Sequence, residues 1–470
     1  MNFKTIFKSL TNKDMRKKIL IVVGILVAYR ILAHIPVPLG SASTFREAVD
    51  SLVSGTDLGG FINLISGGGL TNFSIILVGL SPYITASIVM QLLSKAIPKM
   101  EEISKDGEAG RRKINQWTRV VAVPLAIFQS IAYIFILQQT VLATNTSTAV
   151  NATMGEWALS VTAMTAGSIL LMWLGELITE QGIGNGISTI IFCSIVSSFP
   201  STIANFGSQL FDTTSGSLSL FGWFNLPVNP TIFWILLGLT VGLVIVLYFL
   251  VKINEAQRII TINYAKRVHG NSAYGGIKSI MPIKLIAAGV VPVIFAVAFL
   301  SVPAFLGQLI QRVDPNSQIA QNMVDWFSAP SASTFGQSTG LTPTDYIYPT
   351  LYFLLVVIFT YFYTSIVFNP QEIAENLQKQ GGFIEGVQPG KQTELYFSKT
   401  VNRLNFFGAF ALGIIALLPY LVDYIFIVIL GYPLGLSISG TGLLIVVTVA
   451  LENIRQINSR ALMVTYDDYQ

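Results

Sequence analysis

Few side chains in this sequence could perform catalysis or bind a metal, and they do not cluster. Residues 386–391, GVQPGK, are similar to a phosphate-binding loop, but the stretch is one residue short and Gln392 stands where the motif needs Ser or Thr. The sequence contains no His-Glu-x-x-His and no pair of aspartates within an apolar stretch. His34, His269 and Cys193 are too few for a His/Cys metal site. We therefore predict a protein that is not an enzyme and has no metal or cofactor.

The composition instead predicts a protein that crosses a membrane many times. Of 470 residues, 52% are hydrophobic and only 11% are charged, whereas soluble domains carry about 25% charged residues. The mean hydropathy is +0.64. Ten stretches are long and apolar enough to span a bilayer. They are residues 18–36, 73–94, 119–140, 157–178, 184–205, 231–252, 284–310, 346–368, 402–422 and 436–456.

The lysines and arginines predict the orientation. Ten spans place both termini on one side of the membrane. Of the 28 lysines and arginines, Arg30 lies within the first span, and only Arg46 and Arg312 lie on the side reached after an odd number of spans. All the others lie on the side of the termini. Positive charge collects in the cytoplasm, so we expect both termini there.

The stretch from Leu58 to Leu93 is the most unusual segment. A short apolar piece, Phe61 to Ile65, is followed by the glycines at 67–69 and then by the uncharged run from Phe73 to Leu93. The second run is roughly 30 Å long as a helix and can cross a bilayer, but the first cannot. Irregular backbone at membrane depth persists only where protein or a water-filled cavity covers it. The pattern fits either a re-entrant element that sits in a cavity or an ordinary extracellular loop.

A short sequence pattern occurs in two of the predicted spans. Residues 79–84, GLSPYI, and residues 289–294, GVVPVI, share the pattern Gly-x-x-Pro-x-Ile and lie five spans apart. A repeat of five spans places the second copy upside down in the membrane. Inverted repeats with helices interrupted by Gly and Pro indicate a pathway at the interface between the repeats.

The pathway is expected to be passive. An ion-coupled carrier needs ionisable side chains near the middle of the membrane. These spans hold almost none apart from Arg30 and Glu176, which lies near a cytoplasmic end. A wide conduit that is sealed by apolar side chains fits better. Its cytoplasmic side would carry two long polar loops, 253–283 and 369–401, neither with the hydrophobic content of a separate domain.

The chain resembles the SecY family, the channel subunits of the bacterial Sec protein translocase. The resemblance runs through essentially the whole chain, in order. It rests on seven segments: residues 61–93 (FINLISGGGLTNFSIILVGLSPYITASIVMQLL), 105–119 (KDGEAGRRKINQWTR), 171–192 (LMWLGELITEQGIGNGISTIIF), 262–267 (INYAKR), 289–296 (GVVPVIFA), 362–370 (FYTSIVFNP) and 440–447 (GTGLLIVV).

The resemblance implies an all-α membrane protein of ten helices around an hourglass pore, with a re-entrant plug helix. The helices form two inverted halves: residues 1–252 hold helices one to five and the start of helix six, and residues 231–470 hold helices six to ten. The resemblance implies a pore ring of Leu80, Ile84, Ile187, Ile191, Ile294 and Ile445. It implies a plug over residues 58–72, with Phe61, Ile62, Leu64, Ile65, Gly67, Gly68 and Gly69. It implies a lateral gate near Thr85, Ser87, Gln129 and Ile286.

The resemblance also implies partners and a location. The cytoplasmic loops would dock the SecA motor ATPase or a ribosome through Lys266, Arg267, Lys278, Lys379, Gln388 and Lys391. Small subunits similar to SecE and SecG would complete the complex in the bacterial plasma membrane. The clients would be unfolded preproteins with signal sequences, and their apolar segments would pass through the gate into the lipid bilayer.

The sequence departs from the family pattern at three sites. Gln388 replaces the arginine of Gly-x-Arg-Pro-Gly, Asn271-Ser272 replaces a basic pair, and Ile286 replaces an asparagine. Glutamine cannot make the bidentate, charge-assisted contacts of arginine. An accessory SecY paralogue with restricted clients therefore stays open as an alternative. A secondary solute transporter built on inverted repeats is the alternative from a different class.

Overall fold

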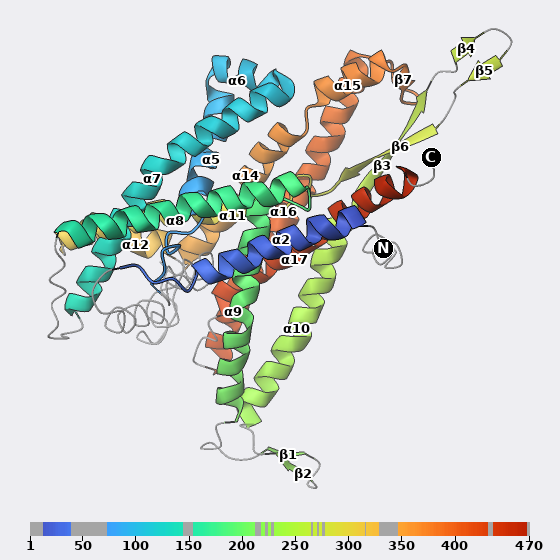
Figure 1. Cartoon of the computed structure of the whole chain (residues 1–470). Helices are drawn as coiled ribbons and strands as arrows, with labels where there is room; N and C mark the ends of the chain where they lie inside the picture. The colour runs from blue at the N-terminus through green and yellow to red at the C-terminus, as the bar shows by residue number, and fades with distance from the viewer. Residues whose placement is uncertain are drawn as a thin grey trace. The chain divides into compact units, whose positions relative to one another are not determined.

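A computed structural model describes residues 13–38, 73–143, 154–211, 218–220, 224–226, 230–264, 267–269, 272–274, 278–314, 316–328, 346–430 and 436–467. Most of these residues are helical (Figure 1). The chain divides into two compact units that are each discontinuous in sequence. The first consists of Met1–Leu236, Val297–Tyr348 and Pro419–Gln470, and the second of Leu237–Ala296 and Pro349–Leu418.

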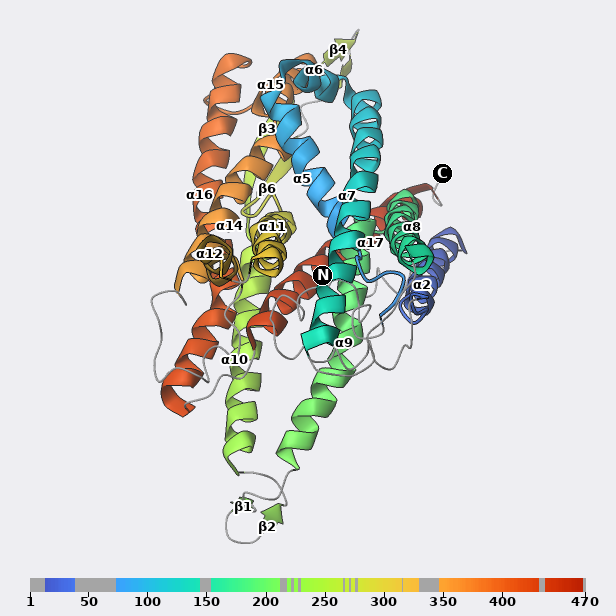
Figure 2. The same ribbon diagram turned by 90° about the vertical axis from the view of Figure 1, so that its left-hand side faces the viewer.

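The first unit contains most of the helices. They are α2 (Lys13–Leu32), α5 (Ser81–Ala96), α6 (Pro98–Lys105), α7 (Gly107–Ala143), α8 (Met154–Gln181), α9 (Gly186–Leu210), α12 (Gln318–Phe327) and α17 (Leu436–Asp467). A small hairpin of β1 (Leu218–Leu220) and β2 (Phe224–Leu226) follows α9. Figure 2 shows α5 and α7 side by side, joined at one end by α6.

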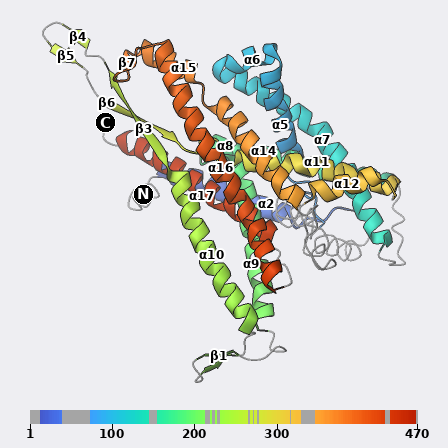
Figure 3. The ribbon, with the colours of Figure 1, turned by 180° about the vertical axis from the view of Figure 1, so that it is seen from behind.

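Four helices run from one unit into the other, and the second unit adds short strands. The four are α10 (Pro230–Glu255), α11 (Val291–Val313), α14 (Ile347–Val367) and α16 (Lys391–Leu430). The second unit also holds β3 (Gln257–Tyr264), β4 (Arg267–His269), β5 (Ser272–Tyr274), β6 (Lys278–Lys284), α15 (Pro370–Lys379) and β7 (Gly382–Phe383). Seen from behind, α14 and α16 lie side by side (Figure 3), and Phe353 packs against Phe410 between them.

Each of the ten predicted spans contains a helix. Within the described residues, six helical segments are long and apolar enough to cross a membrane. They are Arg112–Phe135, Met154–Gln181, Leu236–Glu255, Val291–Gln311, Ile347–Lys379 and Lys391–Leu418. These segments make the chain a multi-span, predominantly helical membrane protein, as the composition predicts.

Two of the predicted spans begin later than expected. The expected span 73–94 becomes helical only at Ser81, and the expected span 284–310 only at Val291. The reason is the same in both places. Gly79 (φ 61°) and Gly289 (φ 63°) adopt the left-handed conformation, which interrupts a helix. A proline follows at the second helical position of each, where its missing N–H costs no hydrogen bond. The repeated Gly-x-x-Pro-x-Ile pattern is thus a repeated backbone geometry.

The two long polar loops, 253–283 and 369–401, fold together around one hydrophobic core. Strand β3 pairs antiparallel with β6 on one side and with β7 on the other, and α15 lies beside β7 (Figure 1). Their shared core consists of Ile260, Ile262, Ile283, Leu377, Ile384, Phe397 and Val401. Neither loop has enough apolar residues alone, but the loops supply one core jointly. We call β3, β6, β7, α15 and the first turns of α16 the cytoplasmic module, after the side of the membrane on which the sequence predicts it to lie.

Removing a large side chain from this core should loosen the module. Phe397 is fully buried, so Phe397→Ala should destabilise the module by about 3–5 kcal/mol. Leu395, which is 54% exposed on the same helix, supplies the control, because Leu395→Ala should change stability by less than about 0.5 kcal/mol. Limited trypsin digestion followed by mass spectrometry measures cleavage within residues 253–283. Equal cleavage rates for the two variants would show that Phe397 does not support the fold.

Candidate functional site

The predicted pore-ring residues lie on apolar helices and are mostly buried. Leu80 directly precedes α5, and Ile84 lies in its first turn, where its N–H donates to the Leu80 carbonyl over 3.0 Å. In the second unit, Ile294 lies in the first turn of α11, where its N–H donates to the Val290 carbonyl over 3.3 Å. Ile84 and Ile294 therefore occupy equivalent positions in the two copies of the repeated geometry.

The remaining ring residues of the first unit lie on two helices that pack together. Ile187 and Ile191 are one turn apart on α9, and Ile445 lies on α17. Ile191 and Ile445 are buried, whereas Ile187 is half-buried. Gly442 lets α17 approach Ile195 of α9 closely, since a Cβ atom there would lie 3.2 Å from its Cγ2. These aliphatic positions therefore sit on a rigid pair of helices.

Polar contacts that the sequence did not predict join the start of α9 to the interior of α17. The backbone N–H of Gly184 donates to the Gln456 Oε1 over 2.7 Å, and Asn453 Nδ2 donates to Thr189 Oγ1 over 3.4 Å. Asn185 caps α9 by accepting from the backbone N–H of Ile187 over 3.1 Å. No local pattern indicates that Gln456 contacts Gly184, because the two residues are 272 positions apart in the sequence.

The predicted gate residues occupy three different environments. Thr85 donates to the Ser81 carbonyl over 3.0 Å, and Ser87 accepts from Gln91 over 3.1 Å, so both bond within α5. Gln129 on α7 has a buried Oε1 that accepts no hydrogen bond from the described residues. Ile286 is buried just before α11, in the second unit. A gate that joins these residues stays a prediction.

The predicted plug, residues 58–72 with Phe61, Ile62, Leu64, Ile65 and the three glycines, lies outside the described residues. The described chain resumes at Phe73, which has a positive φ of 45°.

The predicted docking residues belong largely to the cytoplasmic module. Lys278, Lys379, Gln388 and Lys391 are exposed. Lys278 lies at the end of β6 that pairs with Asn263. Lys266 lies outside the described residues, and Arg267 begins β4, beyond the end of β3.

Gln388 lies in a turn with a fixed shape. Gly386 (φ 80°) and Gly390 (φ 94°) flank it in left-handed conformations that disfavour other residues. The Gln388 carbonyl accepts from Thr393 Oγ1 over 2.9 Å, which ties the turn to α16. The side chain at 388 is therefore displayed by backbone geometry rather than by packing.

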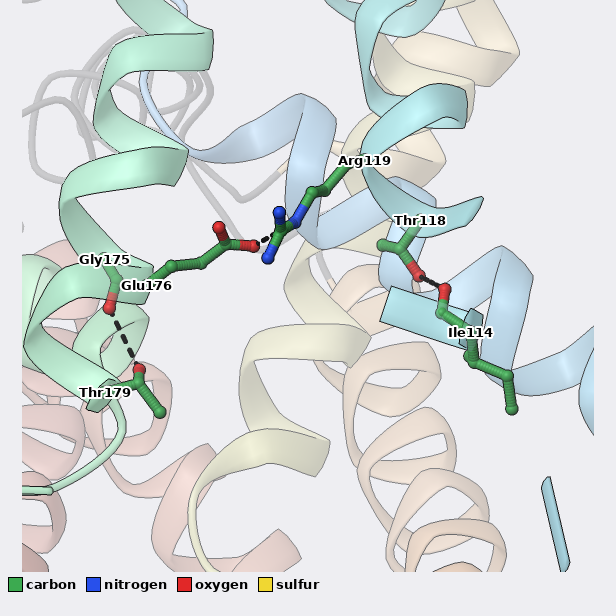
Figure 4. Close-up of polar contacts among 6 residues, drawn as sticks. All are labelled: Ile114, Thr118, Arg119, Gly175, Glu176 and Thr179. Atoms are coloured by element: carbon green, nitrogen blue, oxygen red, sulfur yellow. Dashed lines mark hydrogen bonds and ion pairs between the residues drawn. The ribbon is translucent and has the colours of Figure 1, made fainter. Parts of the chain in front are cut away.

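An ion pair joins α7 and α8. Arg119 Nε lies 2.6 Å from Glu176 Oε1, and the two side chains are 47% and 19% exposed (Figure 4). Thr179 lies one turn further along α8, where it donates to the Gly175 carbonyl and accepts from the Gly186 N–H, both over 2.9 Å. Glu176 is therefore neutralised by a specific partner, which the sequence did not predict.

The described part of the chain contains no cluster of side chains that could hold a metal ion. There, no three His, Cys, Asp or Glu side chains gather closely enough to hold an ion.

Comparison with known proteins gives consistent results along nearly the whole length. The SecY family model matches residues 74–454. The protein translocase subunit SecY of Streptomyces coelicolor is 38% identical over 461 residues, which cover 97% of each chain. The subunit of the same description from Mycobacterium tuberculosis is 34% identical over 465 residues, or 98% of each chain.

Solved structures share the fold. A chain described as "The structure of a protein conducting channel" aligns with a TM-score of 0.57 and 18% identity, covering 93% of this chain and 90% of that one. A channel from a canine ribosome–channel complex of the endoplasmic reticulum aligns over the same fractions with a TM-score of 0.54 and 17% identity.

The strength of the Arg119–Glu176 pair is testable by a double-mutant cycle. Because Arg119 is about half exposed, solvent screens the pair, and we expect a coupling energy below about 1 kcal/mol. Arg119→Gln, Glu176→Gln and the double variant are compared by the free energy of unfolding in detergent at low and high salt. A coupling above about 2 kcal/mol that does not respond to salt would show that the pair is shielded from water.

Proposed function

The chain belongs to the SecY family of protein translocase subunits and forms a protein-conducting channel, and we propose that Leu80, Ile84, Ile187, Ile191, Ile294 and Ile445 form its constriction. One observation carries this proposal: Ile84 and Ile294 occupy the same position in two copies of one backbone geometry. Two equivalent aliphatic side chains at the starts of two equivalent helices suit a ring around a central axis.

The chemistry of these side chains suits a seal for a polypeptide channel. Branched aliphatic groups offer no ligand to a hydrated ion, and a narrow apolar constriction excludes water. No charge occurs in the described sequence of α9 or in residues 436–450 of α17. A passing peptide of any sequence meets only deformable apolar side chains there, so the constriction needs no specific recognition.

We propose a lateral exit for apolar segments. The ten helices would form two inverted halves, within residues 1–252 and 231–470, with the seam near Thr85, Ser87, Gln129 and Ile286. A signal sequence that leaves through such a seam gains about 25 cal/mol per Å² of apolar surface removed from water. The unpartnered Oε1 of Gln129 supports a role at a seam, because a buried amide needs a partner in at least one state. Residues 58–72 would close the channel from the extracellular side.

We propose that the cytoplasmic module is the docking surface for an energy source. It displays Lys278, Lys379 and Lys391 around the exposed Gln388 turn. The docking partner would be the SecA motor ATPase or a ribosome, and small subunits similar to SecE and SecG would complete the complex. The distribution of positive charge supports a cytoplasmic location for the module and both termini. The bacterial origin of the relatives supports the plasma membrane of a bacterium as the location of the chain.

Polar substitution of the ring is the direct test of the constriction. Ile84→Ser and Ile191→Ser should each raise the resting ion conductance in planar bilayers several-fold, because hydroxyls lower the barrier to wetting. Ile203→Ser is the matched control, because Ile203 lies on α9 but is 66% exposed. If all three variants conduct like the parent protein, the constriction lies elsewhere.

Replacing Gln388 tests how the docking turn is coupled to its partner. A charge-assisted hydrogen bond from arginine is worth about 1.5–3 kcal/mol, and glutamine supplies a neutral bond of about half that. We expect Gln388→Arg to raise ATP-driven translocation with the protein's own motor by no more than a few-fold. The same variant should gain markedly with a motor whose own channel has the arginine.

Translocation measured for the four pairings of channel and motor separates the two candidate functions. A large gain with the native motor would mean that Gln388 is not matched to its partner. That result would favour an accessory paralogue with restricted clients over a general secretory channel.

A further inference from the structure

Before each copy of the repeated geometry, a neighbouring helix packs closely against the backbone through a glycine. We call this close contact the clamp. In the first unit, a Cβ atom at Gly167 of α8 would collide with the carbonyl oxygen of Ile75. In the second unit, a Cβ atom at Gly408 of α16 would lie 2.5 Å from the carbonyl oxygen of Leu285, closer than real Cβ atoms come. Ile75 and Leu285 each lie four residues before the left-handed glycine of their copy. The clamp is therefore duplicated together with the Gly-x-x-Pro-x-Ile pattern.

The residue after the clamping glycine differs between the copies. Ser168 follows Gly167, and its hydroxyl donates to the carbonyl oxygen of Gly79 over 2.8 Å in a buried position. Ala409 follows Gly408 and is fully buried, but its methyl group cannot donate a hydrogen bond. The first copy is thus locked by a side-chain hydrogen bond that Ala409 cannot supply in the second copy.

Other contacts also hold the first copy. The Val37 N–H donates to the Phe73 carbonyl over 2.9 Å, and the Ile75 N–H donates to the Ile35 carbonyl over 3.0 Å. Phe73 and Leu77 lie in a core cluster with Tyr133, Ile134 and Met164. In the second copy, the Leu285 N–H donates to the Ala256 carbonyl over 2.9 Å, at the end of the β3–β6 ladder. The first copy is anchored to neighbouring helices, whereas the second is attached to a sheet.

We propose that Ser168 is a positioning residue that fixes the start of α5, and with it Leu80 and Ile84, while Ala409 leaves the start of α11 and Ile294 able to shift. This proposal rests on the function proposed above: of the two equivalent helices at the constriction, α11 yields when the channel opens and α5 serves as the fixed side. The two copies differ here by one hydroxyl group, so exchanging Ser168 and Ala409 should transfer the lock from the first copy to the second.

Exchanging the two residues tests the lock locally. The variants are Ser168→Ala, Ala409→Ser and the double exchange, each in the complete complex in lipid nanodiscs. Hydrogen–deuterium exchange is followed in peptides that cover residues 75–84 and 285–294. Ser168→Ala should speed exchange in residues 75–84 by about fivefold, the effect of losing one neutral buried hydrogen bond. Ala409→Ser should slow exchange in residues 285–294, and the double variant should show both changes.

Ser130→Ala is the matched control. Ser130 is also a fully buried serine of this unit, but its hydroxyl donates to Ala126 of its own helix and lies 3.3 Å from Thr165 Oγ1 of α8, and neither contact reaches residues 75–84. This variant should leave exchange in both peptides unchanged. If Ser168→Ala also leaves residues 75–84 unchanged, or if Ser130→Ala accelerates them equally, the lock does not exist.

The link to channel opening is measured separately. Resting conductance and the transport of preproteins with weakened signal sequences should both rise several-fold in Ser168→Ala. In Ala409→Ser, transport should fall while resting conductance stays low. Local exchange that changes as expected, with conductance and transport unaltered in all variants, would overturn the assignment of α11 as the yielding helix. The serine substitutions at Ile84 and Ile191 test the constriction itself, so failure of this inference is distinguishable from failure of the proposed function.

Discussion

The close approach of α8 to the chain segment before α5 is the contact on which the positions of Leu80 and Ile84, two residues of the proposed constriction, depend. Because Gly167 has no side chain, the α8 backbone reaches the carbonyl of Ile75, and Ser168 can then bond to Gly79. The left-handed Gly79 turns the chain, and Pro82 starts the helix with its φ already set. These contacts and backbone conformations together position Leu80 and Ile84, rather than the packing preferences of the two side chains themselves. Any side chain at position 167 would move all of them together.

Small residues have the same role where α8 meets α9. A Cβ atom at Gly186 would overlap the carbonyl of Gly175, and Thr179 joins the two helices by bonding to both glycines. Inside a membrane the hydrophobic effect does not hold helices together, so close backbone packing and interhelical hydrogen bonds must. The polar contacts of Gln456 and Asn453 with the α8–α9 turn extend this logic to α17. The first unit thus carries five of the six ring residues on elements connected by glycine and amide contacts.

The sequence predicted the features that repeat or persist over many residues. The apolar stretches predicted the six helical segments that, within the described residues, are long and apolar enough to span a membrane, because bilayer thickness imposes a length that is visible without any tertiary information. The Gly-x-x-Pro-x-Ile pattern predicted a real duplication, because Gly and Pro act on the local backbone. The irregular segment from Phe73 to Leu80 was predicted as helix, since apolar composition alone does not reveal a positive φ. The module core, Ser168–Gly79 and Gln456–Gly184 could not be predicted, because each joins residues far apart in the chain.

The construction of the cytoplasmic module bears on how a docking event could reach the constriction. Strand β3 directly follows α10, and β6 ends at Lys284, next to the residue that Gly408 clamps. The ladder between β3 and β6 extends to the pair Gln257–Lys284, and the Leu285 N–H continues it by bonding to Ala256. Only residues 285–290 therefore separate the sheet from the first turn of α11. A hydrogen-bonded sheet is stiffer than a free loop, so displacement of the module is transmitted to α11 over a short and partly clamped connection. Within the described residues, the segment before α5 is bonded instead to residues 35–37, which follow α2, and an isolated bridge joins Pro36 and Ser74. The two copies of one geometry thus have different attachments: the first contacts α8 and the residues that follow α2, and the second contacts α16 and the sheet of the proposed docking surface.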